Sequence, residues 1–79
     1  AALLYKGDIM EYIEVAIRDE FIRLGQAMKL AGILSLGSDI KYEIVDGNVK
    51  VNGEVEERRG RKLHKGDIFT YQGQDYKIV

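Results

Sequence analysis

Five basic side chains within eight residues form the strongest candidate for chemistry in this sequence. They are Arg58, Arg59, Arg61, Lys62 and Lys65. Arginine guanidinium groups bind phosphate through paired hydrogen bonds, and the intervening Gly60 would let the backbone approach a ligand closely. The nearby acids Glu54, Glu56 and Glu57 offer the alternative of a charge-balanced, solvated loop. From composition alone the solvated loop is the favoured interpretation, and an anion-binding surface is the alternative.

Enzyme and cofactor chemistry have few candidates among the 79 residues. Cysteine is absent, which excludes a disulfide, a thiolate metal site and a cysteine nucleophile. The single histidine, His64, has no serine and carboxylate pattern around it that would suggest acid–base catalysis. The sequence contains no Gly-x-x-x-x-Gly-Lys phosphate loop and no dinucleotide-binding fingerprint. We therefore expect a protein that is not an enzyme and that holds no cofactor and no metal.

The formal net charge of −1 at first argues against a polyanionic partner. The charges are segregated along the chain, however. Residues 1–20 carry two basic and five acidic side chains, and residues 21–79 carry ten basic and eight acidic ones. Charges farther apart than a Debye length of about 8 Å are largely screened at physiological salt, so the local density in residues 58–65 matters more than the total.

The apolar runs and the start of the sequence bear on location. No run approaches the length of a membrane span, and the start lacks the long apolar stretch of a secretory signal. These features predict a cytoplasmic protein with no membrane partner. The sequence does not begin with Met, and Met10 is a candidate start. We expect residues 1–9 to be an extension, either native or artificially added, and residues 10–79 to form a single domain.

The elements that must position the basic cluster begin with a strand and a helix. Alternating apolar residues over 13–18 predict a strand with one buried face. Residues 20–31 predict a helix, with Asp19 as its N-cap and Gly32 at its end. The apolar stripe of this helix consists of Leu24, Ala27, Met28 and Ala31. Gly25 costs about 1 kcal/mol relative to Ala inside a helix, which indicates a close packing contact or a close partner.

A second helix is predicted near residues 38–46, where Ile40 and Ile44 share a face and Ser35 or Ser38 is the cap.

The remainder of the sequence predicts strands and tight turns. Asn52-Gly53 lies between alternating valines, which is the strongest short-range signal for a type I′ hairpin. Lys65-Gly66-Asp67 predicts a turn, and residues 68–71 and 76–79 predict the last two strands. The expected order of elements is β-α-α-β-β-β-β.

Several segments in this order resemble the S4 RNA-binding domain, which is built on the alpha-L motif. They are Arg23-Leu24-Gly25-Gln26, Gly37-Ser38-Asp39-Ile40-Lys41, the hairpin from Gly47 to Gly53, and Gly66-Asp67. The segment from Arg58 to Leu63 resembles more narrowly the short bacterial proteins that are little more than this one domain. The resemblance implies an α+β fold, in which two helices pack on a small, strongly bent antiparallel sheet.

The same resemblance implies non-enzymatic binding of structured RNA, with ribosomal RNA as the expected partner and tRNA-like RNA as the alternative. It also implies a role in ribosome assembly or maturation, and we expect a monomer. The binding surface is expected on the two helices and the hairpin. The predicted RNA-binding residues are Arg23, Gln26, Lys29, Ser38, Lys41, Lys50, Arg58, Arg59, Arg61 and Lys62.

Two other functions stay open at this point. The net negative charge and the acidic N-terminal strand would suit a protein-interaction module that docks to a ribosome-associated partner. The other alternative is an RNA-binding domain cut from an RNA-modifying enzyme, whose catalytic part would lie elsewhere. Nuclease treatment separates the first alternative from RNA binding, since a protein contact survives it.

Overall fold

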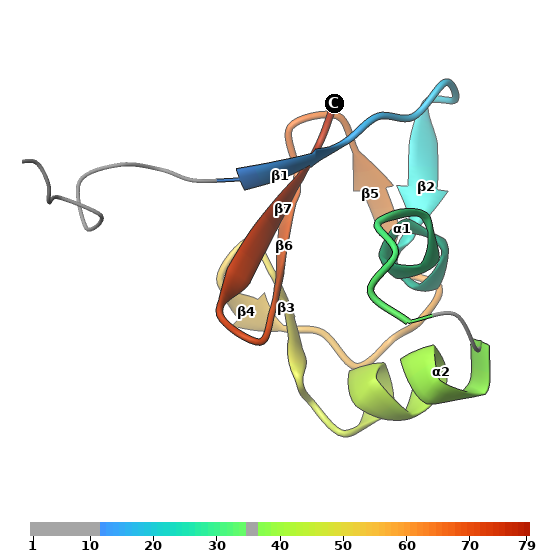
Figure 1. Ribbon diagram of the computed structural model, residues 1–79, viewed down its shortest axis with the longest axis vertical. Coiled ribbons are helices and arrows are strands. Elements are labelled where there is room, and N and C mark those ends of the chain that lie inside the picture. Colours follow the sequence, from blue (N-terminus) through green and yellow to red (C-terminus); the bar gives the residue numbers. More distant parts are fainter. Residues whose placement is uncertain (1–11, 35–36) are drawn as a thin grey trace, which may run out of the picture.

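The computed structural model describes residues 12–34 and 37–79, so the predictions on residues 1–9, Met10 and Ser35 lie outside the described part. Within it, the chain forms seven strands and two helices (Figure 1). They are β1 (Tyr12–Val15), β2 (Phe21–Arg23), α1 (Leu24–Leu30), α2 (Gly37–Val45), β3 (Val49–Val51), β4 (Glu54–Val55), β5 (Lys62–His64), β6 (Ile68–Tyr71) and β7 (Gln74–Ile78). No helix in this part is long and apolar enough to cross a membrane.

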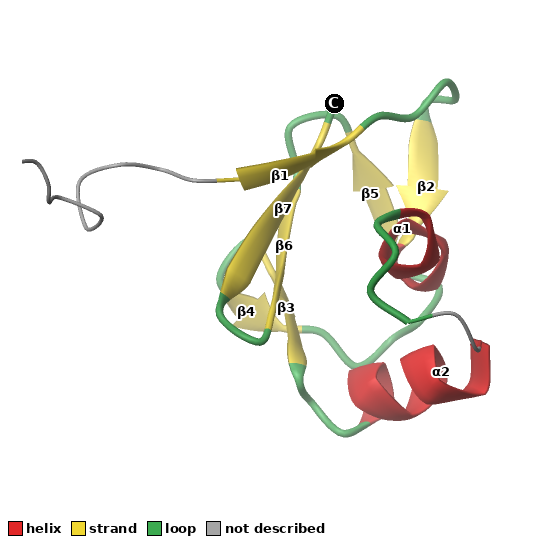
Figure 2. Ribbon diagram, in the orientation of Figure 1, coloured by secondary structure: helices red, strands yellow, loops and turns green. Residues whose placement is uncertain are grey.

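The strands form two separate sheets. The larger has the order β1-β7-β6-β3-β4, and β2 and β5 form a two-stranded antiparallel ribbon. Figure 2 shows the two helices next to each other at one side of the larger sheet, which confirms the predicted α+β arrangement. The larger sheet is mixed rather than wholly antiparallel, because β1 runs parallel to β7. Alternation of apolar residues predicts which face of a strand is buried, but it carries no information on the direction of a distant partner.

The first helix is shorter than predicted, because its expected first turn is a strand. Asp19 does not cap it; Arg23 occupies the N-cap position, with extended backbone angles (φ −83°, ψ 149°) and no side-chain cap. Carbonyl groups of the basic cluster take over the capping. The amide of Leu24 donates to the carbonyl of Arg61 at 2.8 Å, and that of Gly25 donates to the carbonyl of Arg59 at 3.0 Å. These bonds tie the basic cluster to the start of α1.

The hydrophobic core confirms the predicted inner faces of both helices. It includes Leu24, Ala27, Met28, Ile40, Ile44, Val49, Val51, Leu63 and Phe69. Phe69 stacks on Tyr76 with 4.8 Å between ring centroids. Full burial of one such side chain contributes about 1.5–3 kcal/mol, so the core holds this cysteine-free chain together without a disulfide. Ile13, predicted to be buried, is exposed on the edge strand β1.

The hairpin between β3 and β4 has the predicted type I′ geometry, with positive φ at Asn52 (52°) and Gly53 (89°). The Asn52 side chain also joins this turn to the one before β6. Its amide nitrogen donates to the Asp67 carboxylate at 3.3 Å, and its oxygen accepts from the Ile68 amide at 3.1 Å. Asp67 in turn accepts from the His64 amide at 2.7 Å. The hairpin turn at Asn52-Gly53 and the turn at Gly66-Asp67, which both resemble segments of S4 domains, are therefore linked by hydrogen bonds.

Replacing Asn52 separates these two roles. Asn52→Gly keeps the positive φ and removes the side-chain hydrogen bonds, so we expect it to lower the free energy of unfolding by about 1 kcal/mol. Asn52→Ala adds the strain of a left-handed backbone, for a total of about 2 kcal/mol. Thermal unfolding should show two distinct steps in melting temperature, roughly 4–8 °C per kcal/mol in a domain of this size. Equal melting temperatures for the two variants would contradict the strain component.

Candidate nucleic-acid interface

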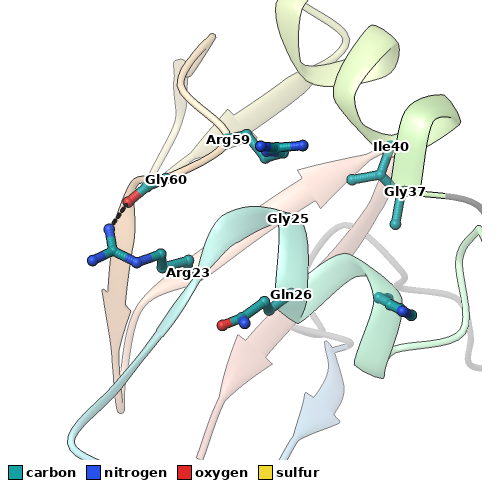
Figure 3. A pocket seen from close by; sticks show the side chains of 8 residues that line it. Arg23, Gly25, Gln26, Gly37, Ile40, Arg59 and Gly60 are labelled. Atoms are coloured by element: carbon teal, nitrogen blue, oxygen red, sulfur yellow. Dashed lines mark hydrogen bonds between the residues drawn. The ribbon is translucent and has the colours of Figure 1, made fainter.

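A groove of about 380 Å³ lies between α1, the start of α2 and the loop that carries the basic cluster (Figure 3). Its polar lining consists of Arg23, Gln26, Lys29 and Arg59, and Ile40 contributes to its apolar floor. We call it the cationic groove. Three of these side chains are cations from two segments about thirty residues apart in the sequence, and no acid from residues 12–34 or 37–79 lines the groove. Such a groove favours an anionic ligand.

A second hollow, of about 460 Å³, adjoins the cationic groove. It is lined by Arg23, Arg58, Gly60, Arg61 and Lys62, so Arg23 and Gly60 belong to both. We call it the arginine hollow. Together the two contain six cationic side chains, which we refer to as the cationic surface: Arg23, Lys29, Arg58, Arg59, Arg61 and Lys62. A chain with a net charge of −1 thus concentrates half of its twelve Lys and Arg residues on one surface.

Strand pairing explains why the two segments converge. In the β2–β5 ribbon, Arg23 lies directly opposite Lys62, and residues that face each other in this way project on the same side of the ribbon. The Arg23 guanidinium donates to the Gly60 carbonyl at 2.8 Å (Figure 3). A Cβ at Gly60 would lie 3.6 Å from that guanidinium nitrogen, which is an ordinary contact. Arg23 thus connects the groove to the hollow while staying exposed.

The glycine inside the predicted helix, Gly25, was expected to allow a close packing contact, and in the structure the Arg59 side chain makes that contact. A Cβ on Gly25 would lie 2.6 Å from Cγ of Arg59, which is too close for any real contact, and 3.2 Å from its Cδ, which is tighter than most. The absence of a side chain at this position lets the Arg59 stem lie on the first turn of α1. The glycine therefore positions a cation of the groove at some cost in helix propensity.

Gly25→Ala should separate stability from binding. The substitution gains up to about 1 kcal/mol of helix propensity, but the new methyl group forces Arg59 into another rotamer. We expect an unchanged or slightly higher melting temperature, together with an affinity for structured RNA that falls by about 10-fold, as for the loss of one charge-assisted phosphate contact. Arg59→Ala provides the reference. If Gly25→Ala bound RNA as tightly as the wild type, the position that Gly25 gives to the Arg59 side chain would not contribute to RNA affinity.

One acid lies beneath the arginine hollow. Glu56 is 7% exposed, and its carboxylate accepts from the Arg58 Nε (2.9 Å), Arg58 Nη2 (3.2 Å) and Arg61 Nη1 (2.7 Å) groups and from the Arg58 amide (3.1 Å). Hydrogen bonding by Arg58, assisted by Arg61, lowers the pKa of Glu56 from 4.5 to about 2 against the opposing effect of burial. The same contact raises the pKa of Arg58. Glu56 therefore stays ionised and fixes the positions of both guanidinium groups.

The other cations of the surface have no comparable acid. Among residues 12–34 and 37–79, the ion pairs within 4.0 Å that involve Arg or Lys are those of Glu56 with Arg58 and Arg61. In the described part, Arg23, Lys29, Arg59 and Lys62 thus have no acidic partner, and all four are exposed. The interpretation as a charge-balanced loop therefore holds only for Arg58 and Arg61, which pair with Glu56. The cationic surface as a whole keeps a net positive charge.

A protein-family model described as S4 domain matches residues 15–79. The chain belongs to the S4 RNA-binding domain family. It is 41% identical over 59 residues to the probable ribosome maturation protein RlbA of Bacillus subtilis, covering 75% of this chain and 83% of that protein. It is 33% identical over 58 residues to the putative RNA-binding protein YbcJ of Escherichia coli, covering 73% and 83%. Both relatives are therefore little longer than the S4 domain itself.

The fold of this S4 domain has a solved counterpart. The solution structure of YbcJ from E. coli, described as an alpha-L motif involved in RNA binding, superposes with a TM-score of 0.70. The match covers 100% of this chain and 99% of YbcJ at 24% sequence identity. The alpha-L fold predicted from the sequence is thus confirmed.

The S4 domain brings together seven of the ten predicted RNA-binding residues. The six cations of the cationic surface and Gln26 line the groove or the hollow. Ser38, Lys41 and Lys50 line neither. Ser38 and Lys41 are exposed on α2, where Ser38 lies inside the first turn rather than at the cap. Lys50 is exposed on β3 of the larger sheet. RNA contact is established for none of the ten, and we expect it at the seven that line the groove or the hollow rather than at Ser38, Lys41 and Lys50.

Two contributors to the site were not among the predicted residues. In the sequence Glu56 is one of three acids that could balance the charge of the cluster, whereas in the structure it accepts hydrogen bonds from two of the arginines and holds them in place. Phe21 was assigned to a helix, whereas it lies on the β2–β5 ribbon between cations. Residues 20–31 contain apolar residues at helical spacing, so nothing in the sequence indicated that Phe21 lies in a strand. No rule of residue spacing predicts which of Glu54, Glu56 and Glu57 is buried. Within the described part, no group of three His, Asp or Glu side chains is arranged to hold a metal ion.

Proposed function

We propose that this S4 domain binds structured ribosomal RNA through the cationic surface and takes part in ribosome maturation as a monomeric, non-catalytic cytoplasmic protein. The convergence of six cations from residues 23–29 and 58–62 carries the proposal. The B. subtilis relative is named a probable ribosome maturation protein, which supports the choice of ribosomal RNA. The name of the E. coli relative, a putative RNA-binding protein, supports RNA in general.

The mechanism is shape recognition combined with phosphate neutralisation. An A-form helix hides its base edges in a deep, narrow major groove, so a small domain reads the spacing of phosphates and the shape of the minor groove. Arg58 and Arg61 can contribute with little loss of side-chain entropy, because Glu56 already fixes them. In the described part, Arg58 Nη1 and Arg61 Nε and Nη2 have no protein hydrogen-bond partner and are left to meet a phosphate.

The salt dependence of affinity tests this mechanism. If the six cations each neutralise a phosphate, the logarithm of the association constant should fall against the logarithm of salt concentration with a slope of about −4 to −5. Affinity for a structured ribosomal RNA fragment would then drop by roughly 10³-fold between 50 and 200 mM salt. Fluorescence anisotropy with labelled RNA gives the slope. A slope shallower than about −2 would contradict phosphate neutralisation by this surface.

A further inference from the structure

A hollow of about 760 Å³ lies beside the cationic groove, between the β1–β2 connection and α1. Ile17, Phe21 and Leu30 contribute to its apolar wall. Leu30 is 58% exposed at the end of α1, so within the described part the core does not cover this wall. We call it the apolar hollow. It is large enough for a flat aromatic ligand, and cations on its rim limit the kind of ligand that fits.

The apolar hollow opens into the proposed RNA-binding surface. Gln26 and Lys29 line both the cationic groove and the apolar hollow. In Figure 3 the Gln26 side chain points away from Arg59, so it extends from the groove toward the other side of α1. Arg18 adds a second cation to the rim of the hollow. A nucleic-acid backbone held in the groove could thus continue along Lys29 toward Arg18.

The chemistry of the lining suits a nucleobase. Phe21 lines the hollow, and the Lys62 Nζ and the Arg23 guanidinium carbon lie over its ring, 4.8 Å and 5.7 Å from the ring centroid. A base that packs against the part of the ring facing the hollow would keep its phosphate within reach of those cations. The Gln26 amide can both donate to and accept from a base edge, and the Asp19 carboxylate in the lining can accept. An apolar peptide would leave the cationic rim without a counter-charge.

We infer that the apolar hollow binds an unpaired RNA base adjacent to the RNA segment held in the cationic groove. This inference rests on the proposed RNA-binding function. A paired base cannot enter the hollow, because its neighbours in the helix cover its faces and its partner occupies its edge. An unpaired base can rotate out of the stack and pack against Phe21 and Leu30, where it is shielded from solvent.

Two RNA probes test the inference: a blunt-ended RNA duplex, and the same duplex with one bulged adenine. We expect the wild type to bind the bulged duplex about 10-fold more tightly, the effect of stacking one base. Phe21→Leu and Leu30→Gln should each abolish that preference. Leu30→Gln should also leave the affinity for the blunt duplex unchanged, because Leu30 lines neither the cationic groove nor the arginine hollow. The matched control is Tyr42→Leu, since Tyr42 is an aromatic residue 63% exposed on α2 and lies outside the hollow.

The outcomes separate this inference from the proposed function. Loss of the preference in both hollow variants, with retention in Tyr42→Leu, supports the inference. Equal wild-type affinity for both duplexes overturns it and leaves RNA binding intact, as does a preference that persists in Phe21→Leu and Leu30→Gln. If the wild type binds neither duplex nor structured ribosomal RNA, the proposed function fails first. Intermolecular NOEs between the bulged base and Phe21 or Leu30 provide a check that does not depend on affinity.

Discussion

The double variant Lys29→Glu/Arg59→Glu should bind structured ribosomal RNA at least about 100-fold more weakly than the wild type at moderate salt. Both side chains are exposed, line the cationic groove, and have no acidic partner in the described part. On the proposed function, each substitution would remove one phosphate contact and place a like charge next to the RNA backbone. Fluorescence anisotropy at constant salt measures the effect.

The fold should survive this change. Glutamate retains the Cβ and Cγ carbons that let residue 59 lie against Gly25, and neither side chain is buried. Lys29 lies in the last turn of α1, where a glutamate costs about 0.3–1 kcal/mol through the helix dipole, so the melting temperature should fall only slightly.

A matched control is available in the same chain. Lys41→Glu/Lys50→Glu makes the same change in net charge at two exposed lysines that line neither the groove nor the arginine hollow. We expect this control to weaken binding by less than about 10-fold, through the long-range field alone. An equal loss of affinity in both double variants would mean that net charge, and not the cationic groove, determines binding.

The largest expected effect on stability comes from Glu56→Gln. Glutamine keeps the size of the side chain, but it loses the charge that accepts hydrogen bonds from Arg58 and Arg61. The fall in the Glu56 pKa from 4.5 to about 2 corresponds to about 3 kcal/mol, and solvent around the exposed ends of the pair reduces this to about 2 kcal/mol. For a domain of this size, a melting temperature lower by roughly 8–16 °C is expected.

The pH dependence of stability follows from the same pKa. Glu56 has a lower pKa in the folded chain than in the unfolded chain, so its contribution is complete above about pH 5.5 and declines as the pH falls from 4.5 toward 2. The difference in free energy of unfolding between wild type and Glu56→Gln should therefore shrink over that range. Chemical denaturation at a series of pH values provides the measurement.

Glu54→Gln serves as the control for this prediction. Glu54 is exposed on β4, and no ion pair within 4.0 Å involves it among the described residues. Its substitution should change the melting temperature little at any pH in the range. Should the Glu56→Gln difference stay constant from pH 6 to pH 2.5, the ionised Glu56 carboxylate would not be the source of the stability.

The features of this fold that depend on residues close in the sequence could be predicted. The buried face of α1, the Ile40 and Ile44 pair of α2 and the type I′ hairpin at Asn52-Gly53 are all set by spacing or by backbone preference within a few residues. Features set by distant partners could not be predicted in the same way. Phe21–Arg23 form a strand because they pair with β5. The parallel pairing of β1 with β7 joins the first and the last strand of the described sequence.

The candidate site divides in the same manner. The basic cluster is visible in the sequence, and Gly25 stands out as a glycine inside a helical stripe. The convergence of Arg23 and Lys29 with the cluster depends on the β2–β5 ribbon and was predicted only through the resemblance to S4 domains. The role of Glu56 depends on which of three neighbouring acids is buried, and alternation over so short a segment does not determine that.

Titration of the ¹⁵N-labelled protein with a structured ribosomal RNA fragment tests the cationic surface most directly. The account predicts that the largest changes in amide and arginine Nε signals occur at residues 23–29 and 58–62, and that they diminish together as salt is raised. Signals of the larger sheet, such as Lys50 and Thr70, should change little. Changes confined to that sheet or to the exposed face of α2 at Tyr42 and Val45, with residues 58–62 unaffected, would contradict it.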